Sequence, residues 1–401
     1  MTITRTWSVR TSALAGLLAL GACTASDDAD TAYEPIPTRG LRSTPFEPSL
    51  SVSFAQLELG YGHTCGLAAD GRAFCMGDHQ YAQLGTSEPM RRCQGGAQPC
   101  SQTPLPVDGG HAFVQLGLDQ RHSCGLTANG EVYCWGFGEG GQLGDGLRTN
   151  SQAPVRVQTS ARFRFLGRGQ SSGNLCAIAE GGQLYCWGIG GDGQGGNGTL
   201  DVAPAPTPVA SNLAFRAVGS GQGFACALAE SGDIYCWGRN NYGRLGTGQS
   251  GATTVPALVA GGLKYAALAV GGQHACGLAV DGSAHCWGFA PSVGSTAPVD
   301  GATRPQPVAG RRSYRAITAG FQHTCAIDTT DQAWCWGPNL GGALGDGSTT
   351  DRIAPVRIAS SQTIASLSAG GTGTCGITRA GRLLCWGTNA YGQLGFEPGD
   401  P

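Results

Sequence analysis

HTCGLAADGRAFCMG, at residues 63–77, has the pattern of two short β-strands around a tight turn at Asp70-Gly71. Glycine supplies the positive φ that a tight hairpin needs. If the loop has three residues with the glycine last, Cys65 and Cys75 lie directly opposite each other, because both are five residues from Asp70. Opposed positions of an antiparallel pair can be close enough for a disulfide. The stretch therefore predicts a hairpin clamped by its own disulfide.

The same spacing between two cysteines recurs along the whole chain, with a period of about 50 residues that is typical of repeat architectures. The predicted disulfides join Cys65 with Cys75, Cys124 with Cys134, Cys176 with Cys186, Cys226 with Cys236, Cys276 with Cys286, Cys325 with Cys335 and Cys375 with Cys385, and also Cys93 with Cys100 in an insertion. An even set with regular spacing favours disulfides in an oxidising compartment. Zinc is the alternative, but the short C-x-x-C knuckles that zinc sites favour do not occur, so we expect no metal and no cofactor.

Each repeat also carries a proline upstream of the cysteines and a large apolar residue nine positions after that proline. The prolines are Pro45, Pro104, Pro154, Pro206, Pro256, Pro305 and Pro355, and the apolar residues are Phe54, Phe113, Phe163, Phe215, Tyr265, Tyr314 and Ile364. We expect four strands per repeat: one after the proline, one at the apolar residue and two around the glycine turn. Seven such repeats predict an all-β protein, a seven-bladed propeller of four-stranded blades, with a β-solenoid as the alternative.

The two ends of the chain are complementary. After Cys385 the sequence is WGTNAYGQLGFEPGDP, so the last repeat lacks its proline strand. The first repeat has a spare one, STPFEPSL at residues 43–50. We expect this N-terminal strand to complete the seventh blade, which closes the ring and covers two sheet edges. A solenoid would need no such complementary ends.

The first 43 residues lie outside this pattern and predict export. Residues 1–22 contain Arg5 and Arg10 and then the apolar run TSALAGLLALGA, as in a secretion signal. The sequence LALGAC resembles the lipobox of bacterial lipoproteins, which implies lipidation of Cys23; an ordinary signal peptide with a free Cys23 thiol is the alternative. Residues 23–43 are polar and acidic and fit a flexible tether. We therefore expect an envelope protein whose only membrane attachment is its lipid anchor, with the outer membrane favoured.

The segments between blades carry a family resemblance. GDHQYAQLGTS, GFGEGGQLGDG, GRNNYGRLGTG, GPNLGGALGDG and GTNAYGQLGFE, together with HTCGL and HTCAI, resemble the regulator of chromosome condensation repeat family over residues 44–401. The resemblance implies a seven-bladed propeller whose loops grip a partner protein. Two repeats depart: the third has Gly196 where leucine is expected, and the fifth, GFAPSVGSTAP, lacks the Q-L-G element. The founder's nucleotide-exchange and chromatin-binding activities are not carried over, because this chain has an export signal, disulfides and no basic tail.

Three sets of residues are candidates for a site. The loop RRCQGGAQPC, closed by Cys93 and Cys100, occurs only in the first repeat; it is either a partner-binding loop with Arg91 and Arg92 or a tolerated surface insertion. Four histidines lie two residues before a first cysteine, and we interpret them as a repeated structural hydrogen bond rather than a metal site: His63, His122, His274 and His323. Six tryptophans follow the second cysteines and are interpreted as packing between blades: Trp135, Trp187, Trp237, Trp287, Trp336 and Trp386.

These observations favour binding over catalysis. The formal charge of −2 offers no field that would attract nucleic acid. Asp145-Gly146 and Asp346-Gly347 lack the other ligands of a calcium loop and are interpreted as turns. No catalytic motif occurs, although a propeller can assemble paired carboxylates at its channel mouth. We expect a monomeric, non-catalytic scaffold that binds an unknown protein at the cell surface; a carbohydrate or cell-wall binder or hydrolase using the channel mouth is the alternative.

Overall fold

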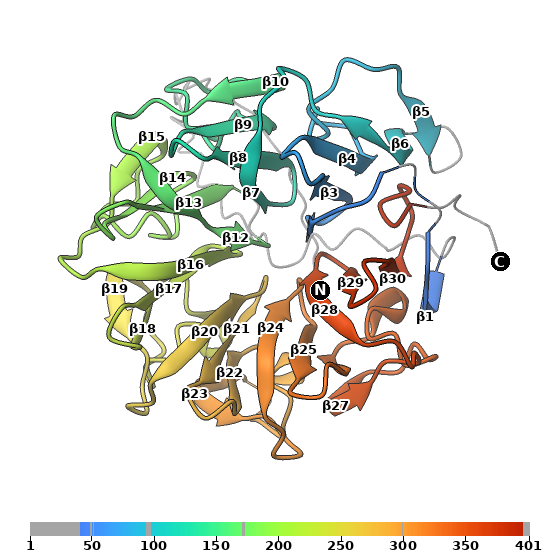
Figure 1. Cartoon of the computed structure of the whole chain (residues 1–401). Coiled ribbons are helices and arrows are strands. Elements are labelled where there is room, and N and C mark those ends of the chain that lie inside the picture. The colour runs from blue at the N-terminus through green and yellow to red at the C-terminus, as the bar shows by residue number, and fades with distance from the viewer. Residues whose placement is uncertain are drawn as a thin grey trace, which may run out of the picture. The chain divides into compact units, whose positions relative to one another are not determined.

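Seven sheets stand around a central axis like the blades of a propeller in the computed structural model (Figure 1). The structure describes residues 41–395, except 49, 51, 94–97, 171, 172 and 299. In each blade, neighbouring strands pair antiparallel, so the chain runs back and forth between the two faces of the ring while successive strands lie farther from the axis. The prediction of an all-β, seven-bladed propeller is therefore confirmed.

The blades follow one another in chain order. Blade 1 has β2 (Gln56–Leu59), β3 (His63–Leu67), β4 (Ala73–Asp78), β6 (Gln98–Pro106) and the extra strand β5 (Arg91–Cys93). Blade 2 has β7 (Phe113–Leu118), β8 (His122–Thr127), β9 (Val132–Gly136) and β10 (Ser151–Arg156). Blade 3 has β11 (Phe163–Leu166), β13 (Asn174–Ala179), β14 (Leu184–Gly188) and β15 (Ala203–Pro208).

Blade 4 has β16 (Phe215–Gly221), β17 (Phe224–Ala229), β18 (Ile234–Gly238) and β19 (Thr253–Leu258), and β12 (Arg168–Gly169) pairs parallel to β16. Blade 5 has β20 (Tyr265–Val270), β21 (His274–Ala279), β22 (Ala284–Gly288) and β23 (Ala302–Pro307). Blade 6 has β24 (Tyr314–Ala319), β25 (Thr324–Asp328), β26 (Ala333–Gly337) and β27 (Arg352–Arg357). Blade 7 has β28 (Ile364–Ala369), β29 (Gly373–Thr378), β30 (Leu383–Thr388) and β1 (Leu41–Phe46).

Helical structure is scarce. The short 3₁₀ turns are η2 (Asn241–Gly243), η3 (Ala290–Ser292) and η4 (Leu340–Gly342). Across the residues that the structure describes, no helix is both long and apolar enough to span a membrane.

The disulfide hairpins have the predicted form. In blade 1, Cys65 pairs with Cys75, and the turn is closed by the Ala68 N–H, which donates to the Arg72 carbonyl (2.9 Å). Three residues remain in the loop, and the last of them, Gly71, has a φ of +83°.

The other six hairpins repeat this arrangement. Their cysteines also lie directly opposite each other, and in all seven hairpins the two Cα atoms of the bridge are 4.0–4.1 Å apart. The six further bridges join Cys124 with Cys134, Cys176 with Cys186, Cys226 with Cys236, Cys276 with Cys286, Cys325 with Cys335, and Cys375 with Cys385. Together with the bridge between Cys93 and Cys100 in the insertion, the structure contains all eight predicted disulfides.

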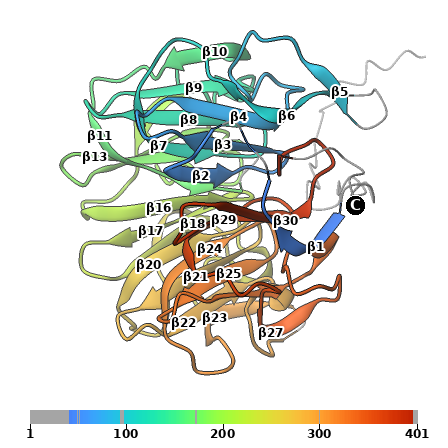
Figure 2. The ribbon, with the colours of Figure 1, turned by 45° about the vertical axis from the view of Figure 1, so that its right-hand side comes forward.

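The ring closes through its two ends. β1 pairs antiparallel with β30, with Leu41 opposite Thr388 and Phe46 opposite Cys385 (Figure 2). The expected N-terminal strand therefore completes the seventh blade. It begins at Leu41, two residues before the predicted segment 43–50.

The repeated prolines lie in the fourth strand of each blade. Pro45 is in β1, Pro104 in β6 and Pro154 in β10, and the other repeats follow this rule. Except in blade 1, where β5 lies outside β6, this fourth strand is outermost and has a hydrogen-bonded neighbour on one side only. Proline has no N–H to offer on the open side, so it discourages pairing with another chain.

The tryptophans pack between blades, as expected from their repetition. All six are buried, and the indole N–H of Trp135, for example, donates to the Gln83 carbonyl of the preceding blade (3.0 Å). A glycine of that same preceding loop lies flat against the ring: a Cβ added to Gly85 would lie 2.6 Å from Trp135 Cδ1. This contact explains why the L-G element recurs.

Two details of the repeat alignment were wrong. Gly196 takes the glycine position, because it lies against Trp237 as Gly85 lies against Trp135; Gly195 therefore stands where leucine is expected. In the fifth repeat the L-G element is altered rather than absent, since Val293 is fully buried and Gly294 lies against Trp336.

The connections between strands alternate between two faces of the ring. Turns between the second and third strands, together with the links from one blade to the next, form the turn face; there the Phe113 N–H donates to the Gly71 carbonyl (2.8 Å). The remaining connections form the loop face, where the Asp78 N–H donates to the Gly62 carbonyl (2.8 Å). The insertion of the first repeat belongs to the loop face.

Candidate functional site

The innermost strands enclose a cavity of about 280 Å³ on the propeller axis. Its lining includes aliphatic side chains of different blades, such as Leu118, Leu268 and Ile317. Polar side chains also line it, among them Glu58 and Arg168.

The third repeat crosses this cavity. Its Arg168 guanidinium lies 2.9 Å from Glu58 Oε1 of blade 1. The side-chain amide of Gln170 donates to the carbonyls of Leu59 (3.4 Å) and Ala369 (3.5 Å), which belong to blades 1 and 7. These contacts span the axis, so the third repeat ties distant blades together.

Glu58 is held in an unusual state for a carboxylate. It is 5% exposed and accepts hydrogen bonds from Gln56 (3.3 Å) and Ser368 (3.2 Å) in addition to the Arg168 ion pair. Burial raises the pKa of Glu58, although Arg168 acts in the opposite direction. Among the described residues that line the cavity Glu58 is the one carboxylate, whereas glycoside hydrolysis ordinarily uses two.

Three of the four repeated histidines bridge neighbouring blades. His63 Nε2 lies 2.8 Å from Ser123 Oγ, His274 Nε2 2.6 Å from Thr324 Oγ1, and His323 Nε2 2.9 Å from Thr374 Oγ1. The Ser123 hydroxyl in turn donates to the Gln83 carbonyl (3.0 Å), so it accepts from the N–H of His63 Nε2. Burial lowers the pKa of His63 and His274 to about 3 and that of His323 to about 4. The interpretation as a repeated structural hydrogen bond fits this geometry.

His122 departs from the pattern for a local reason. In the other three repeats the residue three positions earlier is glycine, and the imidazole folds over it: a Cβ at Gly271 would lie 2.5 Å from His274 Cε1. In the second repeat that residue is Asp119, whose Oδ2 lies 3.8 Å from His122 Nδ1. The matching hydroxyl position of the next blade is Leu175, and His122 Nε2 has no partner in the described structure. Burial raises the pKa of Asp119 well above its usual range and lowers that of His122 to about 4.

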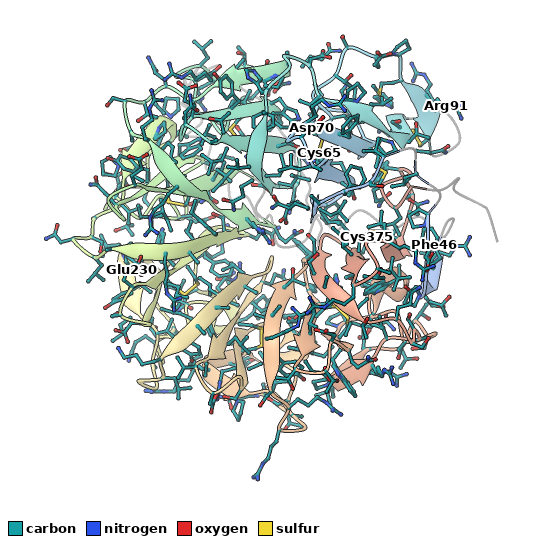
Figure 3. All side chains as sticks on the ribbon, viewed as in Figure 1. Phe46, Cys65, Asp70, Arg91, Glu230 and Cys375 are labelled. Carbon is teal, nitrogen blue, oxygen red and sulfur yellow. A yellow bond between two sulfur atoms is a disulfide. The ribbon has the colours of Figure 1, made fainter. Side chains whose placement is uncertain are left out.

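The insertion of the first repeat forms a disulfide-locked hairpin at the edge of blade 1. β5 pairs with β6, and the bridge between Cys93 and Cys100 joins them. Arg91 and Arg92 are exposed, and Figure 3 shows Arg91 at the periphery of the ring, farther from the axis than Cys65 and Cys375. Cys93 Sγ also lies 3.5 Å from the Tyr391 carbonyl, so the hairpin contacts the C-terminal part of the chain.

Aromatic side chains adjoin the hairpin on the loop face. The His79 N–H donates to the Pro99 carbonyl (2.9 Å), which attaches the following loop to the hairpin. In that loop Tyr81 meets Phe137 of blade 2 edge to face, with ring centroids 5.2 Å apart. The exposed Arg121 guanidinium lies 4.9 Å from the Tyr81 centroid. Aromatic and arginine side chains are enriched at protein interfaces, so this surface has the composition of a binding site.

The carboxylates of the acidic turns, Asp145 and Asp346, are engaged by protein groups of their own turns. The Asp346 carboxylate accepts hydrogen bonds from Ser348 and pairs with Arg352 (2.7 Å), and Asp145 caps its own turn through the Leu147 N–H (3.0 Å). Within the described parts of the chain, no group of three or more histidine, cysteine or acidic side chains is arranged to hold a metal ion.

Sequence reasoning missed the residues that fill the axis. Glu58, Arg168 and Gln170 were not singled out, although the two extra residues of the third repeat were the signal that could have found the last two. The predicted lipidation site, Cys23, and the tether to residue 40 lie outside the described residues.

Comparison with known proteins agrees with this geometry. The family description "Regulator of chromosome condensation (RCC1) repeat" matches residues 129–168 and 231–278, and a second description of the same repeat matches 54–83, 215–244, 314–340 and 364–393.

Curated relatives match parts of the chain. The Arabidopsis thaliana RCC1 domain-containing protein RUG3, mitochondrial, is 31% identical over 142 residues, which cover 35% of this chain and 30% of that protein. The ultraviolet-B receptor UVR8 of Arabidopsis thaliana is 33% identical over 88 residues, 21% of this chain and 20% of the receptor. The matches thus span less than a third of each relative.

Solved structures match more of the chain at lower identity. Human WBSCR16 superposes with a TM-score of 0.73 and 20% identity, over 86% of this chain and 89% of that one. Yeast RCC1 (Prp20), solved bound to Kap60, superposes with a TM-score of 0.71 and 19% identity, over 97% and 96%. This chain therefore has the fold of a seven-bladed β-propeller, and parts of its sequence are similar to the regulator of chromosome condensation repeat.

Proposed function

We propose that this propeller is a non-catalytic scaffold that binds a protein partner, and that it does so at the surface of a bacterial cell, anchored by a lipid on Cys23. The observation that carries the binding proposal is the β5–β6 hairpin. It interrupts an otherwise regular ring, its two strands are locked by the bridge between Cys93 and Cys100, and it presents Arg91 and Arg92 to solvent. Two strands that are already locked together lose little conformational freedom on binding, which favours affinity.

The surrounding loop face extends the same surface. Tyr81, Phe137 and Arg121 adjoin the hairpin and supply the aromatic and cationic groups that dominate many interfaces. Propellers of similar fold bind proteins: yeast RCC1 (Prp20) is bound to Kap60 in one solved structure, and Prp20p has binding properties toward Gsp1p and histones. Kap60, Gsp1p and histones are partners of the yeast protein and do not identify the partner of this chain.

Export is supported by the cysteines. All sixteen cysteines of the repeats and the insertion are paired, and disulfides of this density are typical of oxidising compartments. Metabolic labelling with an alkynyl fatty acid tests the anchor: label on the wild-type protein that disappears in Cys23→Ala supports it, and an unlabelled wild type contradicts it.

The alternative, a carbohydrate or cell-wall binder or hydrolase that uses the channel mouth, has less support. The described cavity lining offers Glu58 as its carboxylate, and that group is engaged by Arg168. A lone, ion-paired carboxyl is a poor acid–base pair for glycosidic chemistry.

The chain itself supplies a variant that tests the binding proposal. In blade 2 the stretch DGLRTN, residues 145–150, connects the same two strands that residues 86–100 connect in blade 1. Replacing residues 86–100 with DGLRTN removes the hairpin and keeps a connection known to this fold. We expect the variant to melt within a few degrees of the wild type.

Crosslinking in envelope extracts, followed by mass spectrometry, then measures the function. The proposal is supported if a protein crosslinks to the wild type but not to the folded hairpin variant. It is also supported if that protein, once purified, binds the hairpin variant with a Kd at least tenfold weaker than it binds the wild type. An equal Kd for both forms would exclude the hairpin as the binding site. The variant Arg148→Leu, which removes an exposed arginine from blade 2, is the matched control and should bind normally.

A further inference from the structure

A cationic patch lies on the turn face of blades 6 and 7, far in sequence from the β5–β6 hairpin. It consists of six exposed arginine side chains: Arg311, Arg312, Arg315, Arg357, Arg379 and Arg382. The carboxylates among them are Glu47, Asp328 and Asp331. Six positive and three negative groups leave a local charge of +3, although the whole chain has a formal charge of −2.

Half of these arginines are compensated. Asp331 accepts from both Arg315 (2.7 Å) and Arg379 (2.9 Å), and Glu47 pairs with Arg382 (3.0 Å). Arg311, Arg312 and Arg357 have no carboxylate within 4 Å among the described residues. These three guanidinium groups therefore lack a counter-charge, and one of them, Arg357, donates to the side-chain oxygen of Gln332.

The backbone at this patch departs from the repeat. In the links that enter blades 2 and 5, the matching positions are Gly110 (φ +64°) and Gly262 (φ +66°), but here the residue is Arg311, with a φ of +46°. Asp331 (φ +64°) likewise stands where the other hairpins of this type carry glycine, such as Gly282. Side chains are costly in this left-handed region, and such strain tends to persist where function requires it.

The Arg312 side chain is held in a defined position. Its guanidinium carbon lies 3.4 Å from the centroid of the Trp334 ring, and the Trp334 indole N–H donates to Asp328 (2.8 Å). Arg357 is the cross-strand neighbour of Trp334 in β27. A guanidinium stacked on an aromatic ring keeps its N–H edge available, and that edge matches a carboxylate in bidentate geometry.

A pocket with a mixed lining adjoins the patch in blade 7. It has a volume of about 250 Å³; Pro48, Leu50, Phe54 and Ile377 form its apolar part, and Glu47 and Arg382 line it as a charged pair. A ligand that covers both features needs several acidic groups and one apolar group nearby. An acidic polypeptide segment with an aliphatic side chain has both, whereas a nucleic acid or a sulfated glycan lacks the aliphatic group.

We propose that this cationic patch binds an acidic segment of a protein, with carboxylates on Arg311, Arg312 and Arg357 and an aliphatic side chain in the adjoining pocket. The site is separate from the hairpin surface and does not depend on it.

The repeats again supply conservative variants. Arg311→Gly copies Gly262, Arg312→Leu copies Leu263, and Arg357→Leu copies Leu258, the residue at the same position of β19. Arg311→Gly also removes a strained side chain, so we expect its melting temperature to equal or exceed that of the wild type. Arg72→Ser, which copies Ser283 on the turn face of blade 5, is the control outside the patch.

Fluorescence anisotropy with a labelled peptide EDELEDG, against the amide control QNQLQNG, tests the proposal in the folded full-length protein. We expect binding of the acidic peptide alone, at least tenfold weaker in the triple arginine variant, within twofold of wild type in Arg72→Ser, and weakened by 0.5 M salt. Equal binding by the hairpin-replacement variant separates this site from the proposed function. Failure of the wild type to bind the peptide, or preference for a heparin fragment or polyphosphate over it, would overturn the proposal.

Discussion

Acidification should destabilise the propeller through its buried histidines. His63, His122, His274 and His323 are at most 2% exposed and have pKa values lowered by burial to about 3 or 4. An unfolded histidine has a pKa near 6.5 and therefore binds a proton more readily than these do. The free energy of unfolding therefore keeps the full contribution of these neutral histidines above about pH 6.5, and this contribution is lost as the pH falls toward their pKa values in the folded protein.

The size of the effect follows from these pKa values. At pH 5 the imidazole is protonated in the unfolded chain and neutral in the folded protein. Each histidine therefore lowers the free energy of unfolding at pH 5 by about 2 kcal/mol relative to pH 7.5. The four together cost about 8 kcal/mol. Asp78 acts in the opposite direction: burial raises its pKa to about 6, and its protonation restores roughly 1.4 kcal/mol over the same interval. Burial also raises the pKa values of Asp119 and Glu58, so a comparison at one histidine is needed to remove these opposing contributions.

Two substitutions at one histidine isolate the effect. His274→Asn copies Asn174, the residue of the third repeat that contacts Ser220 Oγ (3.4 Å) at the same position. The double variant His274→Phe with Thr324→Ala copies the apolar pair that the fourth and fifth repeats carry at these positions. Both should lose about 2 kcal/mol less stability than the wild type between pH 7.5 and pH 5.

Guanidinium unfolding curves at several pH values, with the disulfides intact, measure this difference. Nuclear magnetic resonance titration of the His274 ring gives the folded pKa directly. A wild-type folded pKa near 6.5, or an unchanged pH dependence in both variants, would refute the assignment of neutral, buried imidazoles.

Three further outcomes follow from the structure. Replacing Cys276 and Cys286 with alanine should cost about 3 kcal/mol by the chain-entropy model, seen as a lower melting temperature with native far-ultraviolet circular dichroism. Arg168→Ala should cost about 1 kcal/mol in denaturant unfolding, because the Arg168 side chain is half exposed and Glu58 keeps its hydrogen bonds from Gln56 and Ser368, and adding Glu58→Gln should recover most of that loss. Gly373→His should raise the free energy of unfolding by about 1 kcal/mol at pH 7.5, because the new imidazole would face the Thr64 hydroxyl of blade 1, which has no hydrogen-bond partner among the described residues. An unchanged denaturation midpoint would contradict this prediction.

The fold was predictable because its determinants are local and repeated. The cysteine spacing set the hairpin register, since Cys65 and Cys75 are tied by a turn that only a glycine such as Gly71 fits well. Ring closure was predictable because the spare N-terminal strand and the missing C-terminal one are complementary. The alignment of the third repeat shows where local reasoning fails. The sequence does not indicate which of the consecutive residues Gly195 and Gly196 lies against Trp237, so the leucine position was assigned to the wrong glycine.

The sites were less predictable because they join side chains that are far apart in the sequence. His63 contacts Ser123 sixty residues later, and Arg168 reaches back to Glu58. The cationic patch escaped notice for the same reason: its arginines are scattered between residues 311 and 382 and are balanced by acids elsewhere in the chain. Net charge, which is a sum over the sequence, says nothing about such local separation.

The disulfides and the β1–β30 pairing that closes the ring can form at different stages of folding. Every disulfide among the described residues joins cysteines at most ten residues apart, so each hairpin can oxidise as soon as its own two strands are in an oxidising environment. The β1–β30 pairing joins Phe46 to Cys385 and must wait for nearly the whole polypeptide. We expect the folding chain to have oxidised, disulfide-bonded hairpins before the ring of blades can close.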